Sequence, residues 1–172
     1  SDESENTFYP NQYFNEWNPH AHYAYTGPEI WQDTDGKVTH FVAGMGTGGT
    51  ISGIGKYLKE QNPEVKVIGG DPVGSLYKEY FETGVLAEAN SYKTEGIGED
   101  MIPETMDFSL IDQVIQVGDI EAFTMAQRLA REEGILSGSS AGTAVCAALE
   151  VAQTMNPDDL MVVLIPDTGE RY

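Results

Sequence analysis

Cysteine and basic residues are both scarce in this sequence of 172 residues. Cys146 is the single cysteine, which excludes an internal disulfide and a cysteine-rich zinc site, and its Ala- and Val-rich surroundings favour a small core residue over a reactive thiol. Only nine Lys and Arg residues stand against 28 Asp and Glu, so the formal net charge is −19. Because clustered basic side chains bind phosphate backbones, this charge argues against a nucleic-acid partner and against docking on anionic lipid.

Long apolar runs are also missing. The longest, such as Met161 to Ile165, have the length of a strand and cannot span a bilayer. Residues 1–8 are acidic and polar, the reverse of a signal peptide. Repeats, low-complexity runs and Gly/Ser linkers do not occur, while 40% of the residues are apolar. We therefore expect a globular, cytoplasmic protein without a membrane partner.

Short apolar strands alternate with helices over most of the chain. The pattern predicts strands at 40–43, 65–70, 114–117 and 160–165, with helices at about 49–60, 76–82 and 119–134, and another from the turn at 137–142 to about 155. Asp119 is expected to cap the third helix. Residues 1–28, rich in aromatic, Asn and Pro residues, predict an irregular segment with one short helix. The alternation is typical of an α/β fold with a doubly wound, mostly parallel sheet, which binds ligands outside the carboxyl ends of its strands.

A glycine-rich loop, Gly44-Met45-Gly46-Thr47-Gly48-Gly49-Thr50, follows the first predicted strand and opens a helix. Glycines let the backbone turn tightly and approach a ligand, so that several N–H groups point at one anion. The helix N-terminus adds a partial positive charge, and Thr47 and Thr50 add hydroxyl donors. The loop contains no Lys or Arg to neutralise a phosphate.

Four interpretations of this loop compete. A nucleoside triphosphate loop is excluded because Thr50 stands where its lysine belongs. A dinucleotide fingerprint matches Gly44, Gly46 and Gly49, with Asp71 at about the right distance to bind a ribose hydroxyl. A cup for a single terminal phosphate fits equally. A plain tight turn fits less well, since four glycines and two threonines exceed what a turn needs.

A second turn, Ser137 to Gly142, also precedes a helix. Its simplest interpretation is that Ser139 or Ser140 caps that helix. A serine hydroxyl there could instead meet the ring nitrogen of a heteroaromatic cofactor.

Several motifs in order resemble the fold-type II pyridoxal phosphate (PLP) enzymes, and among these the cystathionine β-synthase and cysteine synthase group. They are Gly46–Thr50, Glu95–Asp100, Ser137–Gly142 and Pro166–Tyr172, and the stretches Asn11–Tyr13, Asn18-Pro19 and Thr26–Ile30 fit the group's interdomain region. The resemblance runs from about Tyr9 to Tyr172. It implies an incomplete large PLP-binding lobe of the tryptophan synthase β-like fold at 29–172, preceded by an interdomain segment at 1–28.

The resemblance also implies roles for individual residues. Gly46, Thr47, Gly48, Gly49 and Thr50 are expected to bind the PLP phosphate, Ser140 the pyridine nitrogen, Gly96 and Gly98 the face of the cofactor, Pro166 and Asp167 the ring, and Gln12 and Tyr13 the substrate carboxylate. Independently of the resemblance, His20, His22 and His40 form no three-ligand pattern, so no metal site is expected and all three are assigned structural roles.

The implied reaction is β-replacement on serine or an O-acylated serine by a thiol, homocysteine or sulfide, giving cystathionine or cysteine in a homodimeric enzyme. The family's Schiff-base lysine lies in a Ser-x-Lys-Asp/Asn-Arg-like stretch well before the glycine loop. None of the six lysines, Lys37, Lys56, Lys59, Lys66, Lys78 and Lys93, has that context. We therefore expect the C-terminal half of such an enzyme, inactive without the missing N-terminal half. The alternatives are an NAD-dependent oxidoreductase domain and a non-catalytic binding or regulatory module.

Overall fold

Four parallel strands form the centre of the computed structural model, which describes residues 6–171. Residues 1–5 of the N-terminal segment and Tyr172, the last residue of the C-terminal motif, lie outside the described residues. The strands are β1 (His40–Gly44), β2 (Lys66–Pro72), β3 (Gln113–Val117) and β4 (Met161–Val163), in the order β3-β2-β1-β4. Val42 pairs with Ile68 on one side and Val163 on the other. The predicted α/β fold with a parallel sheet is confirmed.

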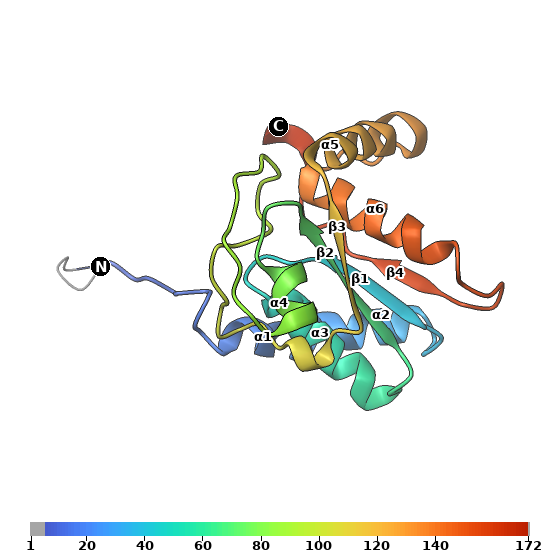
Figure 1. Ribbon diagram of the computed structural model, residues 1–172. Coiled ribbons are helices and arrows are strands. Elements are labelled where there is room, and N and C mark those ends of the chain that lie inside the picture. The colour runs from blue at the N-terminus through green and yellow to red at the C-terminus, as the bar shows by residue number, and fades with distance from the viewer. Residues whose placement is uncertain (1–5, 172) are drawn as a thin grey trace.

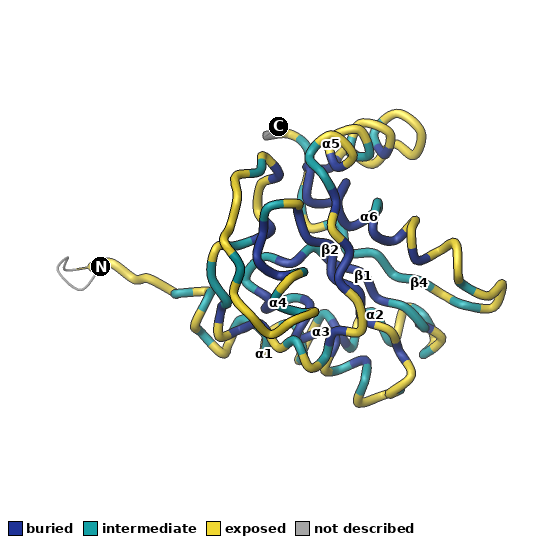
Figure 2. The backbone as a smooth tube through the Cα atoms, viewed as in Figure 1, coloured by how far each residue is buried: buried dark blue, intermediate teal, exposed yellow. Residues whose placement is uncertain are grey.

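Both faces of this sheet are buried, because successive side chains of a strand point to opposite faces. Phe41, Ala43, Val67 and Val114 belong to one core cluster, whereas Val42, Ile68, Ile115 and Val117 belong to the other. The first face is covered by α2 (Gly27–Asp33), α3 (Gly49–Gln61) and α4 (Tyr77–Thr83), and the second by α5 (Asp119–Arg128) and α6 (Ser139–Ala152). Figure 1 shows these two layers, and Figure 2 shows that burial is concentrated at the strands between them.

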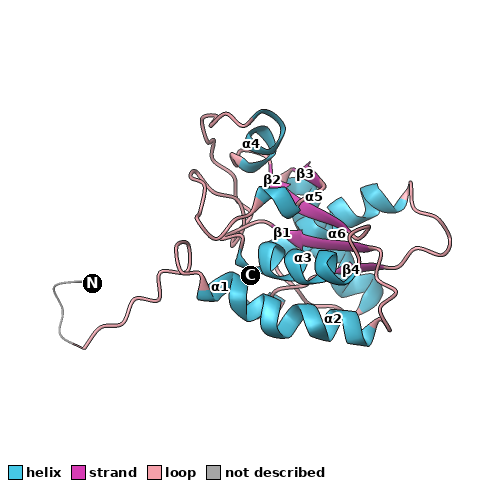
Figure 3. Cartoon of the chain, turned by 90° about the horizontal axis from the view of Figure 1, so that it is seen from below, coloured by secondary structure: helices cyan, strands magenta, loops and turns pink. Residues whose placement is uncertain are grey.

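The N-terminal segment differs from its prediction. Helix α1 (Trp17–Ala21), a π-helical turn η1 (His22–Thr26) and α2 follow one another without a break, and right-handed helical dihedrals persist at His22 and Gly27. Figure 3 shows this run lying beside α3. The expected irregular segment with one short helix is therefore wrong over 17–28. Pro19 and the Gly27-Pro28 pair are ordinarily helix-breaking signals, but the wider π-helical turn accommodates the second of them.

Smaller elements complete the fold. The turn η2 (Phe108–Leu110) precedes β3, the π-helical turn η3 (Leu129–Glu133) extends α5, and η4 (Gly169–Arg171) lies near the C-terminus. Among residues 6–171, no helix combines the length and the apolar character that crossing a membrane requires.

Lys59 is expected to contribute to the stability of the layer that carries the glycine loop. Its Nζ donates to Asp112 Oδ2 at 2.7 Å and to the Val65 carbonyl at 3.1 Å, which ties α3 to the start of β2 and the segment before β3. Lys59→Met should lower the free energy of unfolding by about 1–2 kcal/mol, because the Val65 carbonyl loses its charged donor and Asp112 keeps only the longer ion pair with Lys66, at 3.7 Å. Lys37→Met is the control, since Lys37 meets Asp35 only in an exposed pair at 3.5 Å. Urea unfolding of the two variants measures the difference, and equal stabilities would contradict this role of Lys59.

Candidate functional site

The glycine loop lies at the carboxyl edge of the sheet, between the end of β1 and the start of α3. The loops that follow β2, β3 and β4 leave the same edge, because all four strands are parallel. The predicted site residues after position 40 therefore converge here from distant parts of the sequence, as expected for ligand sites in open α/β sheets.

Two glycines of the loop are required by its shape. A Cβ atom at Gly46 would lie 2.7 Å from the Gly96 carbonyl oxygen, and one at Gly48 would lie 2.6 Å from Met106 Cα. Gly48 also has φ +85°, a left-handed conformation that side chains rarely adopt. The loop thus packs closely between the segments around Gly96 and Met106. At these two contacts there is room for its backbone but not for a side chain.

A cavity of about 200 Å³ opens at this inner surface. Seven of the predicted site residues line it: Gln12, Gly46, Thr47, Gly48, Thr50, Gly96 and Pro166. The remaining lining residues are Gly44, Ile51, Ile97 and Leu164. The sequence motifs that lie far apart along the chain therefore meet around one small cavity.

Five predicted site residues do not line the cavity: Tyr13, Gly49, Gly98, Ser140 and Asp167. Gly98 donates its N–H to the Met45 carbonyl at 2.6 Å, and Asp167 Oδ1 accepts the Gly138 N–H at 2.8 Å. Ser140 is buried, and among the described residues its hydroxyl has no hydrogen-bond partner. The roles assigned to these five residues stay predictions.

The serines of the second turn do not cap α6. Gly138 is the N-cap residue, and it makes no side-chain cap bond. Ser139 Oγ instead accepts the Glu95 N–H at 3.3 Å. Asp119 likewise does not cap α5: its carboxylate accepts the N–H groups of Lys93 and Thr94 at 2.9–3.0 Å. Both expected caps are wrong, and the two side chains anchor the segment that leads to Gly96.

Asn18 and His22, from the N-terminal helical run, support the threonines of the loop. Asn18 Nδ2 donates to Thr47 Oγ1 at 3.0 Å, and His22 Nε2 lies 3.2 Å from Thr50 Oγ1. Burial lowers the pKa of His22, which favours its neutral form. Thr47 Oγ1 also accepts the Gly49 N–H at 3.3 Å, so its own proton stays available for a ligand. The Asn18-Pro19 motif was one signal for this contact; nothing local to His22 indicated its partner.

Tyr13 and Glu99 form a hydrogen-bonded pair next to the loop. The Tyr13 hydroxyl donates to Glu99 Oε1 at 2.7 Å, and this bond, followed by burial, raises the pKa of Tyr13 to about 12. The Glu99 N–H in turn donates to Ser75 Oγ at 3.2 Å. Tyr13 is therefore a neutral phenol at physiological pH, held by an acidic partner.

No lysine among residues 6–171 lines the 200 Å³ cavity. Lys59 and Lys66 pair with Asp112, Lys78 pairs with Glu82 and donates to the Val114 carbonyl, and Lys37 pairs with Asp35. Lys56 lies over the ring of Tyr23.

Asp71 does not face the cavity as a dinucleotide site would require. It is fully buried, and its Oδ2 accepts the Lys78 N–H at 3.1 Å, while Oδ1 has no hydrogen-bond partner among the described residues. Burial raises the pKa of Asp71 to about 6, against the opposing effects of Ser75, Lys78 and Gln116. A carboxylate enclosed in this way cannot receive a ribose hydroxyl, which removes the main support for the dinucleotide interpretation.

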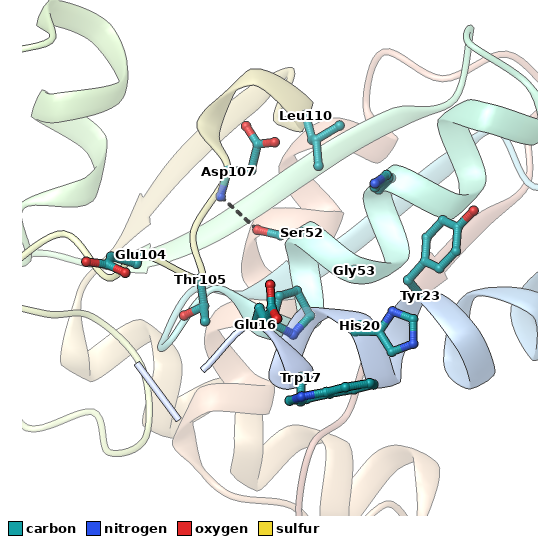
Figure 4. Close-up of a pocket in the computed structure, with 12 residues that line it drawn as sticks. Glu16, Trp17, His20, Tyr23, Ser52, Gly53, Glu104, Thr105, Asp107 and Leu110 are labelled. Atoms are coloured by element: carbon teal, nitrogen blue, oxygen red, sulfur yellow. Dashed lines mark hydrogen bonds between the residues drawn. The ribbon is translucent and has the colours of Figure 1, made fainter. Parts of the chain in front are cut away.

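A larger cavity, of about 500 Å³, lies outside the candidate site (Figure 4). It is open to solvent between α1, the first turns of α3 and residues 104–110, with Trp17, His20 and Tyr23 along its helical wall. Ser52 accepts the Asp107 N–H at 2.9 Å at its inner end. Its one glycine, Gly53, lies outside the glycine loop, and the cavity lacks the convergence of motifs that marks the smaller one.

The elevated pKa of Asp71 predicts a pH-dependent stability. The Asp71 carboxyl binds its proton more tightly in the folded protein than in the unfolded chain. Protonation of Asp71 therefore stabilises the fold fully below pH 3.8, and this contribution is lost as the pH rises through about 6. Asp71→Asn should therefore be more stable than the original protein at pH 7.5, by roughly 2–3 kcal/mol, and the difference should shrink towards pH 4.5. Urea unfolding across this range tests it, with the exposed Asp35→Asn as control. A variant that is no more stable at pH 7.5 would refute the assignment.

Comparison with known proteins agrees with the geometry. The family described as "Pyridoxal-phosphate dependent enzyme" matches residues 1–167. A cystathionine beta-synthase of Apis mellifera is 43% identical over 167 residues, which cover 97% of this chain and 33% of the relative. The O-acetylserine dependent cystathionine beta-synthase of Bacillus subtilis (strain 168) is 41% identical over 170 residues, 99% of this chain and 53% of the relative. A cystathionine beta-synthase of Oryctolagus cuniculus is 44% identical over 161 residues, 94% of this chain and 29% of the relative.

The chain thus spans between 29% and 53% of the length of these curated relatives. The match over 167 residues, the parallel sheet and the glycine-lined cavity at its carboxyl edge lead to one conclusion. This chain belongs to the family of pyridoxal-phosphate-dependent enzymes.

Proposed function

We propose that this chain is part of an enzyme that replaces the β-substituent of serine, or of an O-acylated serine, by a thiol. Homocysteine or sulfide would be the thiol, and cystathionine or cysteine the product. The names of the relatives, two cystathionine beta-synthases and one O-acetylserine dependent cystathionine beta-synthase, support this class of reaction. The observation that carries the proposal is the cavity lined jointly by the glycine loop, Gly96 and Pro166. In the whole enzyme we expect a cytoplasmic homodimer.

The residues at the loop fit a phosphate monoester. The first N–H groups of a helix have no intrahelical acceptor, and α3, with 13 residues, begins at Gly49. Loop glycines without Cβ atoms allow an anion to approach these groups and the hydroxyls of Thr47 and Thr50. Gly46, Thr47, Gly48, Gly49 and Thr50 would hold the phosphate of PLP through donors that carry no formal charge.

PLP, when bound, supplies an electron sink that makes the β-substituent of an amino acid easier to expel. Ser140 would donate its hydroxyl proton to the ring nitrogen and keep that nitrogen unprotonated, which favours elimination and replacement over transamination. Its free hydroxyl is consistent with this role, since the hydroxyl of Ser139 already accepts a hydrogen bond. Gly96, Gly98 and Pro166 would pack against the cofactor, and Asp167 would hold the turn that carries Ser140 through its bond to Gly138.

Gln12 and Tyr13 would bind the carboxylate of the amino-acid substrate. Gln12 lines the cavity, and Tyr13 is its neighbour in the chain, with its phenol kept protonated by Glu99. The backbone of both residues is fixed near the loop, because Asn18 Nδ2 donates to the Gln12 carbonyl at 2.8 Å and Thr105 Oγ1 lies 3.1 Å from the Tyr13 carbonyl.

The catalytic lysine would come from another part of the enzyme. No described lysine lines the cavity, so the groups present bind and orient but provide no amine at the reacting carbon. We therefore propose that this chain alone turns over no substrate. A second candidate function, a non-catalytic PLP-binding module, is favoured by the same observation. The two differ in whether a lysine-bearing part restores turnover.

Binding of PLP to the isolated chain, followed by borohydride reduction, tests the proposal. We expect binding that is lost on dialysis, and no lysine labelled in stoichiometric amount when the reduced protein is mapped by mass spectrometry. Pyridoxal, which lacks the phosphate, should bind more weakly. Stoichiometric labelling of one of the six lysines, together with β-replacement by the chain alone, would contradict the proposal, as would NAD binding in place of PLP.

Ser140→Ala should weaken PLP binding by about two- to tenfold, the effect of losing one hydrogen bond worth roughly 0.5–1.5 kcal/mol. Stability should hardly change, because the hydroxyl bonds to nothing in the described structure. Ser137→Ala is the matched control from the same turn, with a buried hydroxyl that also lacks a partner. Calorimetric titration measures both affinities. Equal effects of the two substitutions would show that Ser140 does not contact the ring.

A further inference from the structure

The glycine loop contains no Lys or Arg, and no lysine of residues 6–171 lines the cavity beside it. The described residues that line the cavity offer an anion only uncharged donors, which are backbone N–H groups, threonine hydroxyls and the Gln12 amide. Such donors are effective only if they already point at the anion, because turning them towards it on binding costs free energy. The orientation of each peptide plane in the loop therefore decides whether the site works.

Three consecutive carbonyl groups of the loop are held by donors from outside it. The Gly98 N–H donates to the Met45 carbonyl, the Tyr77 hydroxyl to the Gly46 carbonyl, and the Thr105 hydroxyl to the Thr47 carbonyl, each at 2.6 Å. The three donors come from separate segments of the chain. None of them lines the cavity, so all three carbonyls are bonded to residues outside its wall.

The N–H group of each peptide is fixed by the same bonds. A peptide unit is planar, and none in the described residues is cis, so its C=O and N–H groups point in opposite directions. Bonding the Gly46 carbonyl to Tyr77 directs the Thr47 N–H away from Tyr77, and bonding the Thr47 carbonyl to Thr105 does the same for the Gly48 N–H. Gly46, Thr47 and Gly48 themselves line the cavity, whereas the three donors that hold the carbonyls do not.

Tyr77 is suited to this task by its surroundings. Its side chain is fully buried at the start of α4. Its ring packs edge-on against the ring of Phe108, with the two ring centroids 5.9 Å apart. Burial raises the pKa of Tyr77 far above its ordinary value, so the phenol stays protonated and acts as a donor. A buried hydroxyl with one hydrogen bond fixes its acceptor more firmly than a solvent-exposed one.

We propose that Tyr77 and Thr105 are positioning residues of the phosphate site, which act by holding the carbonyls of Gly46 and Thr47 so that the next N–H groups face the anion. Neither residue contacts the ligand. The inference rests on the proposed PLP function, since it concerns the same loop, but it applies to any phosphate monoester or to inorganic phosphate bound there.

The test uses Tyr77→Phe and Thr105→Val in the full chain, since both keep the shape of the side chain and remove the hydroxyl. Affinities for PLP, pyridoxal and inorganic phosphate are measured by calorimetry. The amide signals of Thr47 and Gly48 are followed by NMR during the same titrations. We expect about tenfold weaker binding of PLP and of inorganic phosphate in each variant, as for the loss of a well-placed buried donor, with unchanged affinity for pyridoxal. In the original protein both amide protons should shift downfield when phosphate binds, and in the variants these shifts should be smaller.

Tyr80→Phe is the control for Tyr77. It lies on the same helix and also packs on Phe108, with ring centroids 5.1 Å apart, but it is not bonded to the loop. Thr154→Val is the control for Thr105, because its hydroxyl bonds to the Val151 carbonyl at the end of α6. If Tyr77→Phe does not fold, Thr105→Val carries the same prediction.

The outcomes separate this inference from the proposed function. Variants that bind phosphate as tightly as the original protein, or that lose pyridoxal and phosphate binding equally, overturn the positioning role. An original protein whose loop amides do not respond to phosphate or PLP overturns it as well. Selective loss of inorganic phosphate binding in the variants, in a protein that does not bind PLP, would support the positioning role and refute the PLP function.

Discussion

The glycine loop depends on one constraint: it must present several backbone N–H groups to the same point without the help of a cation. Glycine supplies the conformational freedom that such a loop needs, but a loop that is only flexible would also adopt conformations in which its N–H groups do not converge. The loop conformation is fixed by hydrogen bonds from Gly98, Tyr77 and Thr105 to its carbonyls. Asn18 adds a bond to the side chain of Thr47. The site is thus assembled by tertiary contacts rather than by the loop's own sequence.

The rest of the fold can be understood as support for these contacts. The helical run from Trp17 to Asp33 brings Asn18 and His22 to the loop, and Asp119 and Ser139 anchor the segment that carries Gly96 and Gly98. The formal net charge of −19 repels an anionic ligand at long range. Salt screens that repulsion beyond about 10 Å, whereas the donors of the loop act at hydrogen-bond distance, so the local geometry decides the affinity.

Much of the fold was predictable from the sequence because buried parallel strands and their glycine turns leave local signals. The four strands, the loop before Gly49 and the convergence of the motifs at one edge all follow from such signals. The helical run over 17–33 did not, since Pro19 and Gly27-Pro28 indicate breaks, and the π-helical turn that accommodates Gly27-Pro28 has no local sequence signal. The contacts of Tyr77 with Gly46 and of His22 with Thr50 could not be predicted either. They join residues 31 and 28 positions apart, and nothing in the neighbouring sequence indicates the partner.

A crystal structure of the chain grown with PLP would test the central claim most directly. We expect the phosphate within hydrogen-bond distance of the amides between Gly46 and Thr50, with no covalent bond from the cofactor to any of the six lysines. A phosphate bound elsewhere, or a cofactor joined to a lysine of this chain, would contradict it.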